Sequence, residues 1–568
     1  MINTESTPRI ILTAKEFTAV LKGGYIGVKE EDGKGYYEGG SAAVTFSNIE
    51  VIEHLRIENS KGLSSISINH SSIRYFSIIK SDIIFIKIET STIDNFWVGN
   101  SSINSIEVSN SKSRGCTLED SKFNIFQATT LEIDYFDINN STLNSLIIAH
   151  STTNQLRLND SKITGIGISL KSKTEDIFLR KTEITNFNIG ESTTGKIRVS
   201  DNSIVGNFHF NPSSIIKGVL SIEDSKLNKI KIEAKELRKI EIQVSFIQNF
   251  IWEQDSFCLL NLDTCTIVVL EFRQAIIPKD SVFQISNSSI NSVDFSQFVN
   301  TGWLNISSLK PLNSYDRFLE EATINRRVFL TFQSHRFEPV ANKKSRLILI
   351  NSDLGRTSFV NCDLTAFDEF VFFNTKMLEV FVAGTKLPTK VTLPHEPEIE
   401  QPAQERLAFS QFKKIADNRG DNVQATEFLA LEMDAYAKQI TDEKGKCGEK
   451  INLWLNKFSS NWGNDWVRAV LVTFAVNSYL FMFYCLSLGY TLGKDWGLFW
   501  NLFSYSFEFL NPLRKADFLK SDINSLINPS KNPLEITSCA RIIDYLSRII
   551  VAYFTYQTIQ AFRRFGKK

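Results

Sequence analysis

Small polar and apolar residues recur every ten positions between residues 71 and 170. The first position of each decapeptide is serine, from Ser71 to Ser161, except at Leu131. The third is mostly isoleucine, and the tenth is often a turn-forming residue such as Asn100 or Asp120. The eighth position is always apolar, and so is the sixth, which is occupied by Phe76, Ile86, Phe96, Ile106, Cys116, Phe126, Phe136, Leu146, Leu156 and Ile166. This period predicts short β-strands at a fixed spacing.

The apolar positions favour a parallel β-solenoid. Positions 1 and 3 of the decapeptide face inward, and so do positions 6 and 8. A corner between these two pairs therefore interrupts the two-residue alternation of a strand. An antiparallel sandwich also has strands about every 8–12 residues. Here, however, the spacing is constant over a hundred residues, and no Asn-Gly or Asp-Gly hairpin occurs between residues 71 and 170. Two decapeptides per coil predict a repeat of about 20 residues that stacks equivalent residues above one another.

Changes in this pattern divide the chain into six predicted segments. They are an N-terminal cap (1–44), the β-solenoid (45–310), an insertion (311–345), final solenoid coils (346–392), a helical hairpin with a linker (393–449), and a membrane domain (450–568). The cap contains Thr13-x-x-Glu16, the capping box of a helix that would end near Gly24. In the hairpin, Gly420 ends one helix and Asp421 caps the next. The predicted fold class is mainly β, with an α-helical hairpin and a two-helix transmembrane domain after the solenoid.

Two segments of the last domain are candidates to cross a bilayer. Residues 469–490 carry no charge and are long enough as a helix, although a buried core helix is the alternative. Trp454, Trp462 and Trp466 precede this segment, as expected of an interfacial belt. A second span, 542–562, includes Asp544 and Arg548 as an i,i+4 pair near one boundary.

The orientation of the spans follows from the charged residues beside them. Between the spans, 496–513 contains Glu508 and Asn511 and predicts a re-entrant or interfacial segment. The basic tail belongs on the cytoplasmic side, and it comprises Arg563, Arg564, Lys567 and Lys568. Because the first residues do not form a signal peptide, both termini are expected inside a multi-pass protein of the inner membrane.

One face of the last span is polar. Asp544, Arg548, Val551, Thr555 and Thr558 follow one another at steps of three or four residues. Polar residues in a span usually face a bundle interior or water. They are therefore candidates to line a pore formed by several copies of the chain, and helix–helix hydrogen bonding without conduction is the alternative.

Charge and cysteine content exclude several classes of function. The chain has 63 basic and 63 acidic residues, so its formal net charge is zero, unlike that of a protein that coats nucleic acid. Seven cysteines include no Cys-x-x-Cys pair, so neither a disulfide framework nor a zinc site is expected. Six scattered histidines accompany no P-loop, Gly-x-Ser-x-Gly or His-Glu-x-x-His motif. The sequence predicts neither an enzyme nor a cofactor.

Three resemblances add expectations about fold and partners. Ser352-Asp-Leu354 and Cys362-Asp-Leu364 resemble pentapeptide repeats, which build a four-sided right-handed β-helix. The whole plan resembles bacterial β-helix proteins with a two-helix, channel-like membrane domain, and it is similar to the membrane effectors of Hailong-type antiphage systems. The resemblance of the whole plan rests on the repeat, the helical joint from Phe412 to Glu432, and the ending Tyr556-Gln-Thr-Ile-Gln-Ala-Phe-Arg-Arg-Phe-Gly.

The Hailong resemblance implies a tetrameric channel held shut by single-stranded DNA that a nucleotidyltransferase-like partner makes. It also implies an acidic outer end that imitates DNA and senses phage trigger proteins. The candidate acids are Glu30, Glu31, Asp32, Glu38, Glu50, Glu53 and Glu58. The leading hypothesis is a gated pore that disrupts the membrane on triggering. The alternative is a membrane-anchored solenoid scaffold that binds a partner without conduction.

Overall fold

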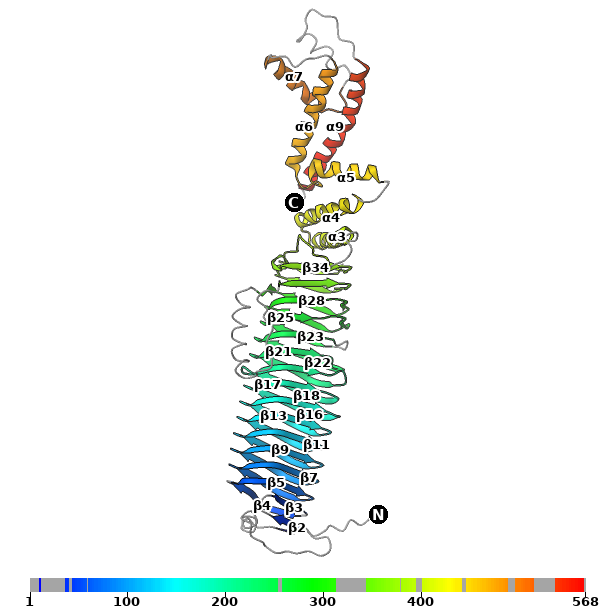
Figure 1. Cartoon of the computed structure of the whole chain (residues 1–568). Coiled ribbons are helices and arrows are strands. Elements are labelled where there is room, and N and C mark those ends of the chain that lie inside the picture. Colours follow the sequence, from blue (N-terminus) through cyan, green and yellow to red (C-terminus); the bar gives the residue numbers. More distant parts are fainter. Residues whose placement is uncertain are drawn as a thin grey trace, which may run out of the picture. The chain divides into compact units, whose positions relative to one another are not determined.

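Each decapeptide of the repeat forms one β-strand in the computed structural model. The structure describes residues 10–11, 36–39, 43–47, 49–58, 60–253, 258–312, 344–377, 379–394, 401–441, 446–488, 496–514 and 537–565. The chain divides into two compact units, Met1–Thr392 and Leu393–Lys568. The first is built from strands and the second from helices (Figure 1).

The strands of the first unit alternate between two sheets, so that one coil contributes one strand to each. The first sheet contains β1 (Ile10–Ile11), β4 (Ile49–Glu58), β6 (Ser72–Ile79), β8 (Thr92–Gly99), β10 (Lys112–Glu119), β12 (Glu132–Asn139), β14 (Thr152–Asn159), β16 (Ser172–Arg180), β18 (Ser192–Ser200), β20 (Ile215–Glu223), β22 (Glu236–Gln243), β24 (Leu259–Asp263), β27 (Val282–Ser286), β30 (Trp303–Ser307), β33 (Thr357–Val360) and β35 (Phe381–Ala383). The second contains β2 (Tyr36–Gly39), β3 (Ala43–Ser47), β5 (Lys61–Asn69), β7 (Asp82–Glu89), β9 (Ser102–Ser109), β11 (Lys122–Thr129), β13 (Thr142–Ala149), β15 (Lys162–Ser169), β17 (Glu183–Ile189), β19 (Ile204–Phe210), β21 (Lys226–Ile232), β23 (Phe246–Trp252), β25 (Thr266–Glu271), β28 (Ser289–Asp294), β31 (Lys310–Pro311), β32 (Arg346–Ile350) and β34 (Glu369–Phe373). Two short strands, β26 (Ile276–Ile277) and β29 (Val299–Asn300), pair beside them, and a 3-10 turn covers Leu364–Ala366.

The register confirms the predicted coil of about 20 residues. Lys112 of β10 lies opposite Thr92 of β8 on one side and Glu132 of β12 on the other, and all three strands are parallel. The tenth residue of each decapeptide has a positive φ, 51° at Asn100 and 47° at Asp120. Asparagine and aspartate tolerate this left-handed conformation better than most residues. The chain therefore turns there from one sheet into the other.

The inward positions are those that the pattern predicts. Positions 1, 3, 6 and 8 are buried in most decapeptides, whereas positions 2 and 10 are exposed. The strand pairing skips the fourth position, as between Ser113 and Gly115 of β10. At this interruption the buried positions change from odd numbers (1 and 3) to even numbers (6 and 8). Phenylalanines pack along a sheet at Phe76 and Phe96, and Phe126 also packs on Phe136 of the other sheet, with ring centroids 4.7 Å apart. The core is thus a continuous column of apolar side chains.

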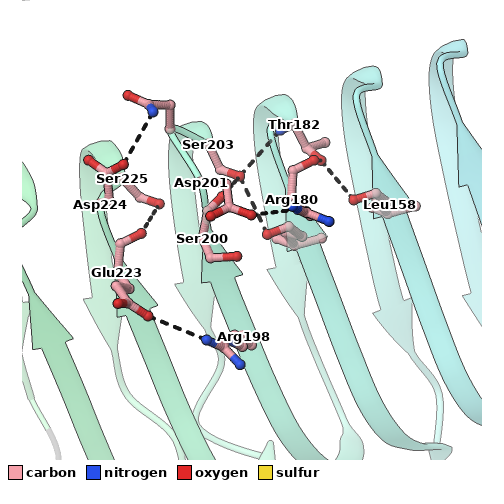
Figure 2. A network of polar contacts seen from close by, with 12 residues as sticks. Leu158, Arg180, Thr182, Arg198, Ser200, Asp201, Ser203, Glu223, Asp224 and Ser225 are labelled. Carbon is pink, nitrogen blue, oxygen red and sulfur yellow. Dashed lines mark hydrogen bonds and ion pairs between the residues drawn. The ribbon is translucent and has the colours of Figure 1, made fainter.

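The serine at position 1 has a hydrogen-bonding role in addition to its small size. The backbone N–H of Ser101 donates to Oγ of Ser121, one coil further on, at 3.0 Å. The same hydroxyl donates to the backbone oxygen of Glu119 at 2.6 Å. Figure 2 shows the equivalent corner of later coils, where Thr182 N–H donates to Ser203 Oγ. The ladder therefore satisfies buried backbone groups that a corner would otherwise leave unpaired.

Replacing one member of this ladder should destabilise the solenoid. In Ser121→Ala the N–H of Ser101 loses its acceptor inside the protein, which costs about 1–3 kcal/mol. Urea unfolding of the full-length protein measures the loss. Ser102→Ala, at an exposed position of the next strand, is the matched control and should change stability by less than about 0.5 kcal/mol. Equal losses in the two variants would show that the serine ladder has no special role.

The repeat tolerates extra residues at its corners without losing the ladder. One coil gains a residue at Lys171, so that Thr152 pairs with Lys173. The predicted insertion at 311–345 lies mostly outside the described residues. On its far side the ladder resumes, because Ser292 of β28 pairs with Arg346 of β32. At the other end, β1 pairs with β4 and β2 runs antiparallel to β3. The predicted cap helix between Thr13 and Gly24 also lies outside the described residues.

The second unit contains a helical hairpin followed by a bundle. Its helices are α3 (Gln401–Arg419), α4 (Asn422–Thr441), α5 (Cys447–Ser460), α6 (Trp466–Ser487), α7 (Trp496–Phe509) and α9 (Ser538–Phe565). The turn between α3 and α4 is as predicted: Gly420 has a φ of 77°, and the N–H of Gln424 donates to the Asp421 carboxylate at 3.0 Å. Phe412 and Phe428 pack between the two helices.

Capping residues set where the two long helices begin. The Asp465 carboxylate accepts from the N–H of Arg468, so α6 begins at Trp466 rather than at Ala469. The hydroxyl of Thr537 accepts from the N–H of Ala540, so α9 begins at Ser538, one turn before the predicted position 542. By length and composition, α6 is the one helix in the described part of the chain that is apolar enough to cross a membrane.

Candidate functional site

Helices α6 and α9 pack side by side (Figure 1), and many of their large apolar residues are exposed. Leu471 on α6 is 64% exposed and Ile549 on α9 is 69% exposed. The exposed set continues with Val467, Phe474, Tyr479, Met482, Phe483 and Leu486 on α6, and with Ile542, Tyr545, Leu546, Tyr556, Ile559 and Phe562 on α9. A helix pair in water turns its apolar face to the core. Here apolar side chains also cover the outer face, and an exposed apolar surface of this extent marks an interaction site.

Polar side chains lie between these helices and α7. The hydroxyl oxygens of Thr473 and Thr558 are 2.9 Å apart, and both contact backbone carbonyls of α6 and α9. Asn477, near the middle of α6, donates to the backbone oxygen of Ser506 in α7 at 2.8 Å. We call Thr473, Asn477, Ser506 and Thr558 the polar seam. All four face protein rather than the apolar exterior.

A charge cluster of Arg514, Asp544 and Arg548 lies at the other end of this interface. Arg514 Nη2 is 2.7 Å from one oxygen of Asp544, and Arg548 Nη2 is 2.9 Å from the other. The side chain of Asp544 is only 5% exposed and that of Arg514 is fully buried. One carboxylate therefore holds two guanidinium groups, and the cluster carries a formal net charge of +1.

Arg514 also fastens α7 to α9. Its Nη1 donates to the backbone oxygen of Phe509 at the end of α7, and its Nη2 donates to the hydroxyl of Ser547 in α9, both at 2.7 Å. The guanidinium carbon lies 3.6 Å from the centroid of the Phe509 ring. Phe481, Tyr484, Cys485, Leu488, Phe509 and Ala540 form the apolar core at this end. A cation among apolar side chains is stable only when it is paired and hydrogen-bonded.

The candidate pore-lining residues lie on the inner side of α9. Thr558 belongs to the polar seam, Val551 is buried, and Thr555 is half-buried. Asp544 and Arg548 form the i,i+4 pair that the sequence indicates. In this single chain the predicted polar face is therefore packed against α6 and Arg514 rather than open.

The structure places the two re-entrant candidates at the end of α7 and in the turn that follows it. Glu508 and Asn511, the re-entrant candidates, are both exposed. The Asn511 side chain accepts from the N–H of Leu513 and supports the turn. The buried charge is Arg514, which sequence reasoning missed. Its place in the segment Asn511-Pro512-Leu513-Arg514-Lys515 gives no signal in the sequence that identifies its partner.

The remaining candidate residues fall at the ends of the chain. Among the candidate acids, Glu58 is exposed and pairs with Arg56 at 3.0 Å, Glu50 is half-buried in β4, and the backbones of Glu38 and Glu53 lie in β2 and β4. Glu30, Glu31 and Asp32 lie outside the described residues. In the basic tail, Arg563 is exposed and Arg564 is within α9. Lys567 and Lys568 lie outside the described residues.

A joint of hydrogen bonds connects the hairpin to the start of α6. Trp462 is 5% exposed and donates from its indole nitrogen to Asp434 of α4 at 2.8 Å, so it is not a free residue of an interfacial belt. Asn464 donates to the backbone oxygen of Thr426, also in α4. Tyr436 of α4 donates to Glu449 of α5 at 2.5 Å, and this hydrogen bond raises the pKa of Tyr436. The start of α6 is thus fixed to α4 and α5.

Comparisons with known proteins do not assign this architecture to a family. The chain matches no protein-family model, no curated protein and no solved structure at a significant level. Its class follows from the coordinates: a parallel β-solenoid of about 15 coils, followed by a helical unit with an apolar exterior and one candidate membrane span.

Proposed function

We propose that this protein is an oligomeric, gated membrane pore with a β-solenoid sensor. The observation that carries the proposal is the outer face of α6 and α9, where large apolar side chains are exposed while the polar seam and the charge cluster lie inside. In lipid, polar and charged groups are stable when they face a bundle interior or water. In water, by contrast, exposed apolar side chains of this extent would have to be covered by another protein surface.

In the proposed topology both α6 and α9 cross the inner membrane, and both termini are cytoplasmic. α9 carries Arg541, Asp544 and Arg548, which lower its mean hydropathy, but its exposed face is apolar. The basic tail and the start of α6 then share the cytoplasmic side, in agreement with the positive-inside rule. The charge cluster lies near the opposite boundary, and the segment that contains α7 is re-entrant.

The polar seam supports a closed state in the single chain. Thr473 and Thr558 bond to each other, so no polar face of the helix pair is left free to line water at this level. We propose that opening separates α9 from α6, so that the seam residues and Thr555 face a pore on the axis of several copies. A pore lined by apolar side chains excludes water, and a pore lined by polar side chains is hydrated.

The biological setting is also a proposal. The resemblance to Hailong-type effectors supports membrane disruption in bacterial antiphage defence, with a tetramer, a regulatory single-stranded DNA and a phage trigger as candidate partners. Averaged particle images of the full-length protein in detergent test the oligomer. We expect a closed ring of copies with α6 and α9 around its axis. Particles that contain only one chain would exclude this form of the pore.

A membrane-anchored scaffold is the second candidate, because the Thr473–Thr558 contact already satisfies this interface within one chain. Exchange of residues 450–568 for an unrelated two-span anchor separates the two functions. A scaffold should keep its cellular activity after the exchange, whereas a pore should lose it.

A further inference from the structure

Helix α5 turns its apolar face away from the protein. Ile451, Trp454 and Phe458 lie on one side of the helix, and all three are exposed, Trp454 by 62%. The side that packs on the rest of the unit consists of Leu453, Ser459 and Ser460, which are buried. In a soluble amphipathic helix the larger apolar residues would occupy the packed side. The outer face of α5 is therefore built to be covered.

The position of α5 indicates what covers it. Figure 1 shows α5 crossing the end of the α6–α9 pair, at the level where α6 begins and α9 ends, and α5 contacts both helices. Only residues 461–465 separate it from α6, and Asn461, Trp462 and Gly463 all have positive φ, which forms a sharp turn. The exposed apolar residues of α5 precede those of α6, beginning with Val467.

The side chains of this face are suited to the boundary between headgroups and acyl chains. The rings of Trp454 and Phe458 stack, with centroids 5.3 Å apart and planes at 7°, and present one flat apolar surface. Arg468, Arg563 and Lys457 are exposed at the same end of the helical unit. Apolar and aromatic residues beside basic ones are typical of helices that lie in the plane of a membrane surface.

We propose that α5 is an interfacial helix that binds the cytoplasmic lipid surface through Ile451, Trp454 and Phe458. The inference rests on the proposed membrane insertion of α6. In this proposal α5 contacts lipid in addition to the membrane spans. Helix α5 then connects α4 to the bilayer surface. Because Trp462 joins α5 and α6 to Asp434 of α4, a movement of the hairpin would tilt α5 in the membrane surface.

Spin labels on the full-length protein in phosphatidylcholine–phosphatidylglycerol vesicles test this placement. The exposed Cys447 and Cys539 are first replaced by serine. Single nitroxides are then attached to I451C, W454C and F458C, and N452C is the control at an exposed residue on the flank of α5. Collisions with oxygen should exceed those with a water-soluble nickel chelate at the first three sites, and the order should be reversed at residue 452.

A label at L471C, on the exposed side of α6, distinguishes the lipid contact of α5 from the membrane insertion of α6. Lipid exposure at 471 with water exposure at 451, 454 and 458 would overturn the inference about α5 alone. Water exposure at 471 would overturn the membrane proposal together with it. Strong spin–spin broadening at residue 454 would show that a second copy of the chain, rather than lipid, covers this face.

Discussion

Replacing Asp544 by alanine is expected to remove about 3–5 kcal/mol from the stability of the helical unit. Asp544 is the carboxylate that both Arg514 and Arg548 contact, and the substitution leaves two guanidinium groups in a largely apolar site. Breaking a buried ion pair by removing one partner has a cost of this size, because a desolvated charge remains without compensation. Unfolding of the full-length protein in detergent, followed by circular dichroism, measures the loss.

Two further variants show whether the charge cluster is responsible. Glu508→Ala removes an exposed acid from the same unit and should change stability by less than about 0.5 kcal/mol. Arg548→Ala should be milder than Asp544→Ala, because Arg514 keeps its contact with Asp544. An Asp544→Ala protein as stable as the Glu508→Ala protein would contradict the structural role of the cluster.

The repeat made the solenoid predictable, but the chemistry of its corners was not. The fixed spacing of Phe76, Phe96 and their equivalents indicates which side chains are inward, because positions 1, 3, 6 and 8 are buried together only when a corner interrupts the two-residue alternation of the strand. The recurring serine at the first position indicates a small residue in a narrow corner. That is correct but incomplete, since the hydroxyl also pairs with a backbone N–H twenty residues away. A hydrogen bond between neighbouring coils can be identified only from the three-dimensional structure.

The candidate site was less predictable, because its central residue comes from a connection. The i,i+4 spacing correctly placed Asp544 beside Arg548. Nothing local indicates that Arg514, thirty positions earlier in the chain, also reaches Asp544. The interfacial belt expected at Trp454 did not identify the whole outward face of α5, for a related reason. Periodicity shows that Ile451, Trp454 and Phe458 share a face, but it does not show whether that face meets protein or solvent.

The proposed pore makes a further prediction with a large effect. If the solenoid restrains the helical unit, cutting the chain between Pro394 and Gln401 should release the pore. A specific protease site is inserted at residues 395–400, and the full-length protein is reconstituted into liposomes with a potassium gradient. The same insertion in a chain whose residues 450–568 are replaced by an unrelated two-span anchor is the control.

Potassium flux through these liposomes before and after cleavage is the most direct test of a gated pore. We expect little flux from the intact protein, a rise of at least about tenfold after cleavage, which corresponds to a shift of about 1.4 kcal/mol or more in the gating equilibrium, and no rise in the anchor control. Cleavage that leaves the helical unit in the membrane and produces no flux would contradict the account, and so would flux that is equal before and after the cut.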